Sequence, residues 1–143
     1  MNIYFACSIT GGREFERVYQ HLTAALLADG HTLPTAYLAQ PSAVTTEANI
    51  SPREVYERDI SWIQNTDALI AEVSVPSHGV GYEIGFALNE GKPVLCLCQD
   101  GRKLSKMISG NSHPALAVKY YKDADKAIDL ARQFVMSIVT DQE

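Results

Sequence analysis

The chain has 143 residues, of which 46% are hydrophobic and 20% are charged, and its formal net charge is −5. These values are typical of a single globular domain with a core of its own. The negative charge argues against nucleic-acid polymers as partners, because phosphate backbones require basic surfaces, but it allows a small anionic ligand held by backbone N–H groups. No apolar run is long enough to span a membrane, and the first residues lack the basic stretch of a signal peptide, so we expect a cytoplasmic protein.

Short apolar runs alternate with amphipathic patterns along the whole chain. The apolar runs predict five strands, at residues 2–7, 31–35, 68–73, 93–98 and 115–120. The intervening patterns predict helices at 14–28, 52–65, 81–89 and 123–138, a helical turn at 104–108 and a loop at 39–49. This alternation predicts one α/β, Rossmann-like domain over residues 1–143, with a five-stranded parallel sheet flanked by helices on both faces.

Ligands of parallel α/β sheets bind outside the carboxyl ends of the strands. The expected site therefore lies in the loops that follow the strands, at residues 8–13, 34–49, 74–81 and 99–110. The odd number of cysteines, all on predicted strands, favours buried core thiols over a disulfide framework at Cys7, Cys96 and Cys98. The four histidines show no metal-ligand spacing. We predict neither a metal ion nor a cofactor.

The first of these loops combines hydroxyl groups, glycines and an arginine directly after a strand and before a helix. Its polar and glycine positions are Ser8, Thr10, Gly11, Gly12 and Arg13. Such a segment can hold an anion, because glycines let the backbone approach and a helix N-terminus adds a positive field. It matches neither the Walker pattern nor the dinucleotide fingerprint. The alternative is a turn that needs glycine only for its geometry.

Glu83 lies in a glycine-rich segment after the third predicted strand. The spacing of Gly79, Gly81 and Gly85 is one residue too long for a dinucleotide fingerprint. In a helix that starts at residue 81, Glu83 would lie in the first turn, where the helix field stabilises the carboxylate anion. A glutamate placed there only for helix stability is the alternative.

Two further acidic residues are weaker candidates. Asp59 lies on the predicted helix 52–65 among several other charges, where a solvated side chain is the more common outcome. Glu72 stands near the end of the third predicted strand, beside the same loop as Glu83.

Five segments, in order from the first strand to beyond the fourth, carry a family resemblance. They include Ser8-Ile9-x-Gly11-Gly12-Arg13, Asp59-x-x-Trp62-x-Gln64, Ser77-x-Gly79-Val80-Gly81-Tyr82-Glu83, Gly91-Lys92-Pro93 and residues 101–108. Together they resemble the nucleoside 2-deoxyribosyltransferase superfamily, and within it the 2'-deoxynucleoside 5'-monophosphate N-glycosidases. The resemblance implies a dimeric enzyme that cleaves the N-glycosidic bond of a nucleotide.

The resemblance also implies roles for individual residues. Glu83 matches the family nucleophile, and Asp59 matches the aspartate that supports the leaving base or its protonation. The substrate-binding positions that it implies are Tyr4, Ser8, Ile9, Thr10, Gly11, Gly12, Arg13, Tyr19, Ser77 and Gly79. A further segment is implied to reach the site of the neighbouring subunit, with Ser105, Lys106 and Met107.

The predicted reaction is hydrolysis of a 2'-deoxynucleoside 5'-monophosphate to free base and 2-deoxyribose 5-phosphate, through a glycosyl-enzyme intermediate on Glu83. Ser77 and Ser105 favour a 5'-phosphate over a free 5'-hydroxyl, because hydroxyl donors suit an anion. Ile9 favours a deoxy sugar, because a 2'-hydroxyl packed against it would remain unpaired.

Two departures from the family pattern bear on specificity. Related proteins have a histidine near Ala36, which leaves the preferred base open, and an arginine where this chain has Thr10, which weakens one phosphate contact. Three alternatives stay open: a base-exchanging deoxyribosyltransferase, a ribonucleotide glycosidase acting on cytidine monophosphate, and a nucleotide-binding module without catalysis.

Overall fold

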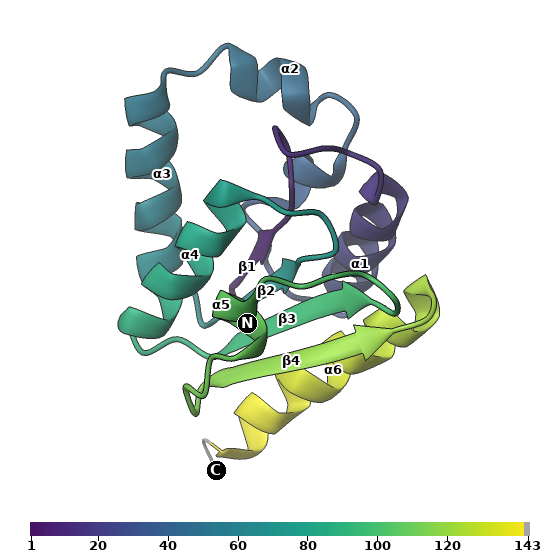
Figure 1. The fold of residues 1–143 in the computed structure, drawn as a ribbon. Coiled ribbons are helices and arrows are strands. Elements are labelled where there is room, and N and C mark those ends of the chain that lie inside the picture. The colour runs from purple at the N-terminus through teal and green to yellow at the C-terminus, as the bar shows by residue number, and fades with distance from the viewer. Residues whose placement is uncertain (142–143) are drawn as a thin grey trace.

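The computed structural model describes residues 1–141 and has a four-stranded sheet at its centre (Figure 1). The strands are β1 (Ile3–Ala6), β2 (Ala68–Glu72), β3 (Val94–Gln99) and β4 (Leu116–Tyr121). They are parallel and lie side by side in the order of the sequence, with Ile3 opposite Ala68 and Leu69 opposite Val94. The predicted parallel α/β architecture is confirmed for the described residues.

The second predicted strand, at 31–35, is wrong, so the sheet has four strands and not five. The segment runs beside β1, but it contributes only an isolated bridge between Thr32 and Asn2. Further along, the Phe5 N–H donates to the side-chain hydroxyl of Thr35 at 2.9 Å, and not to a backbone carbonyl. Pro34 lacks an N–H with which to continue a ladder, and the chain then turns into η1 (Ala36–Ala39).

Four long helices cover the two faces of the sheet (Figure 1). One face carries α1 (Glu16–Ala28) and α6 (Ala124–Asp141), and the other carries α3 (Pro52–Gln64) and α4 (His78–Asn89). Two short helices complete the described residues, α2 (Ala43–Ala48) and α5 (Lys106–Ser109). The predicted loop at 39–49 therefore contains a helix. No helix within residues 1–141 is both long enough and apolar enough to cross a membrane.

The strands divide their side chains between two hydrophobic clusters. Ile3 and Phe5 pack under α1 and α6, whereas Tyr4 and Ala6 pack under α3 and α4. This alternation follows from the two-residue period of a strand. The cysteines are free and buried, as predicted.

The helix α3 begins at Pro52, as the sequence predicted. The Ser51 hydroxyl accepts from the Glu54 N–H at 3.2 Å, the Glu54 carboxylate accepts from the Ser51 N–H at 3.0 Å, and Pro52 occupies the first helical position. This capping box fixes where the helix begins, and so it fixes which α3 side chains face α4.

Candidate active site

A pocket of about 560 Å³ opens at the carboxyl edge of the sheet, between the first loop, α2, α3 and the start of α4. It brings together six of the positions singled out in the sequence, namely Ile9, Thr10, Asp59, Ser77, Gly79 and Glu83. The pocket lies where the topology of a parallel sheet places ligand sites.

Two carboxyl groups from neighbouring helices line this pocket, Glu83 on α4 and Asp59 on α3. The phenol of Tyr4, on β1, is buried beneath them, and its hydroxyl contributes hydrogen bonding that lowers the pKa of both carboxyl groups. Burial and the negative charges of Glu83 and Asp59 raise the pKa of Tyr4 far above its ordinary range. The phenol therefore stays protonated and available as a donor.

Burial raises the pKa of Glu83 to about 8, and the hydrogen bond from Tyr4 and the charge of Arg58 only partly oppose this effect, while Asp59 adds to it. The sequence analysis expected the opposite, a carboxylate stabilised by the first turn of a helix. That expectation is wrong, because α4 begins at His78 and has no acidic residue in its first turn. Glu83 lies in the second turn, where the helix field has faded and burial dominates.

Asp59 is partly buried, with its side chain 16% exposed, so it is not the solvated helix residue that its neighbours indicated. Its Oδ1 accepts from Arg58 Nε at 2.8 Å. Burial raises the pKa of Asp59, and Arg58 opposes that rise through its hydrogen bond and its positive charge.

Glu47 on α2 is a third carboxylate that lines the pocket. It accepts from the Tyr37 hydroxyl at 2.9 Å and forms an ion pair with Arg58 at 3.1 Å. The sequence analysis placed residues 34–49 among the ligand-binding loops but did not single out Glu47. No local pattern marks it, because its role depends on a side-chain contact with Arg58 on α3, 11 residues further along the chain.

The first loop meets the pocket at Ile9 and Thr10. Behind them, a Cβ atom on Gly11 would lie 2.4 Å from the Pro76 carbonyl oxygen, and Gly12 has a φ of 133°, which glycine adopts much more readily than other residues. Both glycines are therefore required by the geometry of the loop. Ser8 is buried, and its hydroxyl has no partner in the described residues.

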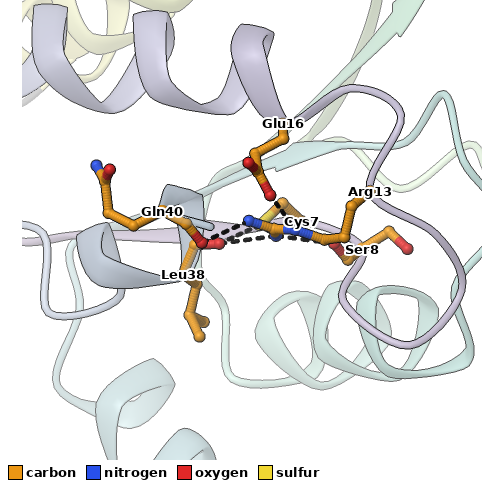
Figure 2. A network of polar contacts seen from close by, with 6 residues as sticks. All are labelled: Cys7, Ser8, Arg13, Glu16, Leu38 and Gln40. Carbon is orange, nitrogen blue, oxygen red and sulfur yellow. Dashed lines mark hydrogen bonds and ion pairs between the residues drawn. The ribbon is translucent and has the colours of Figure 1, made fainter. Parts of the chain in front are cut away.

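Arg13 is not among the residues that line the pocket, and its side chain links the first loop to the segment at 38–40 (Figure 2). Its guanidinium donates to the carbonyl oxygens of Leu38 at 2.8 Å, Gln40 at 2.9 Å and Ser8 at 3.2 Å. Its Nε also donates to the Glu16 carboxylate at 2.9 Å. Because most of its N–H groups are satisfied by the protein, Arg13 shapes the loop and does not line the pocket.

Ser77 and Gly79 stand at the beginning of α4, on the rim of the pocket. Ser77 caps the helix, with its hydroxyl accepting from the Val80 N–H at 3.3 Å. A Cβ atom on Gly79 would lie 3.6 Å from Glu83 Oε1, so the absence of a side chain leaves room beside the carboxylate.

The remaining predicted positions lie outside the pocket. Tyr19 is buried on the opposite face of the sheet, edge-on to Phe5 and 5.5 Å below the Arg13 guanidinium. A second hollow of about 730 Å³, on the other side of α4, is lined by Ser105, Lys106 and Met107. Glu72 is fully buried between Ser74 and Tyr121, and its pKa is raised to about 6, chiefly by burial.

The apolar wall of the pocket was missed in the sequence. It comes largely from one side of α3 and the segment before it, and it comprises Ile50, Pro52, Val55, Tyr56, Ile60, Val80 and Tyr82. Tyr56 and Tyr82 meet edge-on, with ring centroids 6.2 Å apart. An exposed tyrosine or valine on an amphipathic helix carries no local sign that it borders a ligand pocket. Among residues 1–141, no group of three or more His, Cys, Asp or Glu side chains is arranged to hold a metal ion.

Known proteins resemble this chain in sequence and in fold. The family described as nucleoside 2-deoxyribosyltransferase matches residues 3–131. A protein of Methanosarcina mazei with the provisional name 2'-deoxynucleoside 5'-phosphate N-hydrolase 1 is 36% identical over 137 residues, which cover 96% of this chain and 85% of the relative. The 5-hydroxymethyl-dUMP N-hydrolase of Rattus norvegicus is 42% identical over 113 residues, which cover 76% of this chain and 69% of that enzyme.

A solved structure extends the likeness to the fold. The Clostridium botulinum CMP N-glycosidase superposes with a TM-score of 0.72 at 19% identity, and the match covers 94% of this chain and 99% of that one. At 19% identity, this structural similarity supports the fold alone. The assignment to a family rests on the sequence match. The chain belongs to the nucleoside 2-deoxyribosyltransferase family, as its sequence motifs predicted.

Proposed function

We propose that this protein hydrolyses the N-glycosidic bond of 2'-deoxynucleoside 5'-monophosphates, with Glu83 as the nucleophile. The observation that carries the proposal is the pair of carboxyl groups, Glu83 and Asp59, that line one pocket above the phenol of Tyr4. Glycosidic cleavage needs one carboxylate at the anomeric carbon and a second group at the leaving base. The names of the relatives from Methanosarcina mazei and Rattus norvegicus support the same chemistry.

The reaction proceeds in two displacements. As the bond from the anomeric carbon to the base nitrogen breaks, positive charge develops on the sugar, and the Glu83 carboxylate bonds to that carbon. The base leaves with the bonding electrons and takes a proton, with Asp59 supporting that transfer. Water then attacks the same carbon, gives up a proton that replaces the one taken by the base, and releases 2-deoxyribose 5-phosphate and the free Glu83 carboxylate. No metal ion or cofactor is needed at any step.

Three features of the pocket support a deoxynucleotide as substrate. Ile9 presents an apolar side chain where a 2'-hydroxyl would need a hydrogen-bond partner. Ser77 and the backbone at the start of α4 offer donors to a phosphate, which the helix field also attracts. The apolar wall that contains Val55 and Ile60 suits the faces of a base. An enzyme of free nucleotides is expected to work in the cytoplasm.

Homodimerisation belongs to the same proposal. The family resemblance implies that Ser105, Lys106 and Met107 reach the site of a neighbouring subunit. In this chain they line the second hollow, which shares Ser77 and Val80 with the pocket. A partner segment seated in that hollow would therefore border the phosphate end of the pocket.

The test is release of free base from the four deoxynucleoside monophosphates, with the matching nucleosides and ribonucleotides as comparisons. We expect turnover of at least one deoxynucleotide and a loss of at least about 1,000-fold in Glu83→Gln, because the nucleophile is removed. Glu90→Gln is the matched control, since Glu90 is an exposed residue at the end of the same helix. Turnover of nucleosides alone, or normal activity in Glu83→Gln, would overturn the proposal.

A base-exchanging transferase is the second candidate, favoured by the family to which the chain belongs. It would use the same nucleophile but pass the sugar to another base. Adding a free acceptor base to the assay separates the two reactions. A hydrolase yields 2-deoxyribose 5-phosphate at an unchanged rate, whereas a transferase yields a new nucleotide only when the acceptor is present.

A further inference from the structure

Arg58 precedes Asp59 on α3 and contacts two acidic residues at once. Its Nε donates to Asp59 Oδ1 at 2.8 Å. At its other end, Nη1 lies 3.1 Å from Glu47 Oε1 and Nη2 donates to Glu47 Oε2 at 3.2 Å. The guanidinium thus makes a two-point contact with Glu47 and donates a third N–H to the Asp59 carboxylate.

The guanidinium is also held by two aromatic rings. Its central carbon lies 4.8 Å from the ring centroid of Trp62 and 5.9 Å from that of Tyr37. The Tyr37 hydroxyl donates to the same Glu47 carboxylate at 2.9 Å. The Arg58 side chain is only 21% exposed. Hydrogen bonds at the edge of the guanidinium and aromatic rings against its planar faces therefore leave Arg58 little freedom to move.

We propose that Arg58 is a positioning residue for the glycosidic reaction: it fixes the Asp59 carboxylate at the base end of the pocket, and Glu47 and Tyr37 in turn fix Arg58. The inference rests on the proposed function and extends it to a residue that does not itself touch the substrate. It gives α2, which carries Glu47, a part in the reaction.

The reason lies in what Asp59 faces. Around it stand Arg58 on the same helix, Glu47 on α2, Tyr4 on β1 and Glu83 on α4. Of these groups, Arg58 alone carries a positive charge. With one oxygen bound to Arg58, the carboxylate has a defined rotamer, so its other oxygen keeps a constant direction. A misplaced catalytic group can cost a reaction about 100-fold even when the displacement is near 1 Å.

A purely structural role is the competing explanation, in which Arg58 ties α2 to α3. Loss of such a structural contact would lower the melting temperature, but it would leave the pKa values that define the kcat–pH profile unchanged. Loss of a positioning residue removes both the donor and the positive charge beside Asp59. The pKa of that carboxyl group then rises further, and the limb of the kcat profile that follows Asp59 moves to higher pH.

The test compares Arg58→Met with Arg53→Met. Methionine keeps an apolar contact for Trp62, and Arg53 is a matched control because it pairs with Glu57 on the same helix with its side chain 86% exposed. We expect kcat to fall about 10- to 100-fold in Arg58→Met, with KM changed less than about threefold, because orientation is lost and binding is kept. Arg53→Met should match the wild type. Arg58→Lys keeps the charge without the planar fork, so its kcat should be intermediate.

A double-mutant cycle with Asp59→Asn separates the two explanations. If Arg58 acts through Asp59, Arg58→Met should cost little once Asp59 is already asparagine. Equal costs in both backgrounds, or a wild-type pH profile in Arg58→Met, would overturn the proposal. If Arg58→Met fails to fold, Arg58→Lys and Glu47→Gln can each be combined with Asp59→Asn in the same double-mutant cycle.

An NMR titration of the Asp59 carboxyl carbon provides a readout that does not depend on turnover. Its midpoint should be higher in Arg58→Met than in Arg53→Met. Absence of any deoxynucleotide turnover in the wild type would contradict the proposed function, whereas an unmoved Asp59 midpoint would contradict only the role of Arg58.

Discussion

The half-buried carboxyl group of Glu83 lowers the stability of the fold when it ionises. Burial raises its pKa from 4.5 to about 8, so the folded protein retains a proton that the unfolded chain releases. Between these two pH values the native state binds more protons than the unfolded state, and stability therefore falls as pH rises. A nucleophile held in this way is only weakly solvated, which favours attack on a sugar carbon once it is ionised.

Glu83→Gln should consequently stabilise the protein, and the gain should depend on pH. Glutamine cannot ionise, so the variant and the wild type should melt at similar temperatures below about pH 3.5, where Glu83 is protonated in both states. The difference should then grow up to pH 8 and reach at least about 3 °C, since one pKa unit corresponds to about 1.4 kcal/mol. Thermal unfolding at pH 5, 6, 7 and 8 measures it.

Two comparisons make that measurement specific. Glu90→Gln removes an exposed carboxylate from the same helix and should show no such trend. The pKa of Glu72 is also raised, to about 6, but Glu72 is present in both proteins, so its contribution to the difference cancels. A difference that is constant with pH would show that burial does not govern the ionisation of Glu83.

Among the elements, α4 shows what local sequence rules could and could not predict. They identified a helix after the third apolar run and placed Glu83 on it, but they started the helix at residue 81. Gly79 and Gly81 are poor helix formers, so the sequence pattern did not predict the first turn of the helix. The structure begins α4 at His78, directly after the cap formed by Ser77. This shift moves Glu83 out of the reach of the helix field and reverses the expected direction of its pKa.

The segment between β1 and α3 departs further from the prediction. A strand was predicted at 31–35, yet Thr35 uses its side chain where a strand would use its backbone. Arg13 resembled an anion ligand by its position in the first loop, yet the carbonyls of Leu38 and Gln40 bind it. Both outcomes depend on contacts between segments about 25 to 30 residues apart, which no local window contains.

Gly11→Ala should disturb the first loop through one backbone contact. The added methyl group would lie 2.4 Å from the Pro76 carbonyl oxygen and 2.9 Å from the Ser8 hydroxyl, and the carbonyl belongs to the segment that leads into α4. The loop must move away, and Ile9 and Thr10 move with it. We expect KM to rise at least about tenfold and the variant to lose about 1–3 kcal/mol of stability, as overpacked sites do.

Steady-state kinetics and chemical denaturation measure both effects of Gly11→Ala. Gly85→Ala serves as the stability control, because its methyl group would meet no atom within 4 Å and alanine favours a helix. Wild-type KM and stability in Gly11→Ala would show that the two loops can separate without cost.

Across the whole molecule, the two faces of the sheet differ in what they border. The face under α1 and α6 is mainly packed core, whereas the face under α3 and α4 borders the pocket. The rule for parallel sheets predicted the edge at which the pocket lies, and the family motifs predicted Glu83 and Asp59 as site residues, both of which line that pocket. The wall that includes Glu47 and Tyr56 could not be predicted, because it forms only where residues from α2, α3 and α4 meet around the pocket.

The second hollow extends this argument to assembly. Met107 has 84% of its surface exposed, and it borders the hollow beside α4. An exposed methionine next to an apolar hollow is typical of a protein interface. Ser77 lines both the hollow and the pocket, so a second copy of the chain bound there would complete the phosphate end of the site. Met107→Asp should therefore weaken the dimer and lower kcat/KM together, because a buried unpaired carboxylate opposes association.

Sedimentation velocity across a range of concentrations, alongside kinetics at the same concentrations, tests this expectation. Met136→Asp is the matched control, since Met136 is 69% exposed but lies on α6, beside a separate hollow between α6 and the residues that follow α1. We expect the wild type and Met136→Asp to sediment as dimers with equal kcat/KM. Met107→Asp should sediment as a monomer and recover activity as its concentration rises, because mass action restores the dimer. A wild type that is fully active as a monomer would remove the partner subunit from the site and leave Ser77 and the start of α4 to bind the phosphate alone.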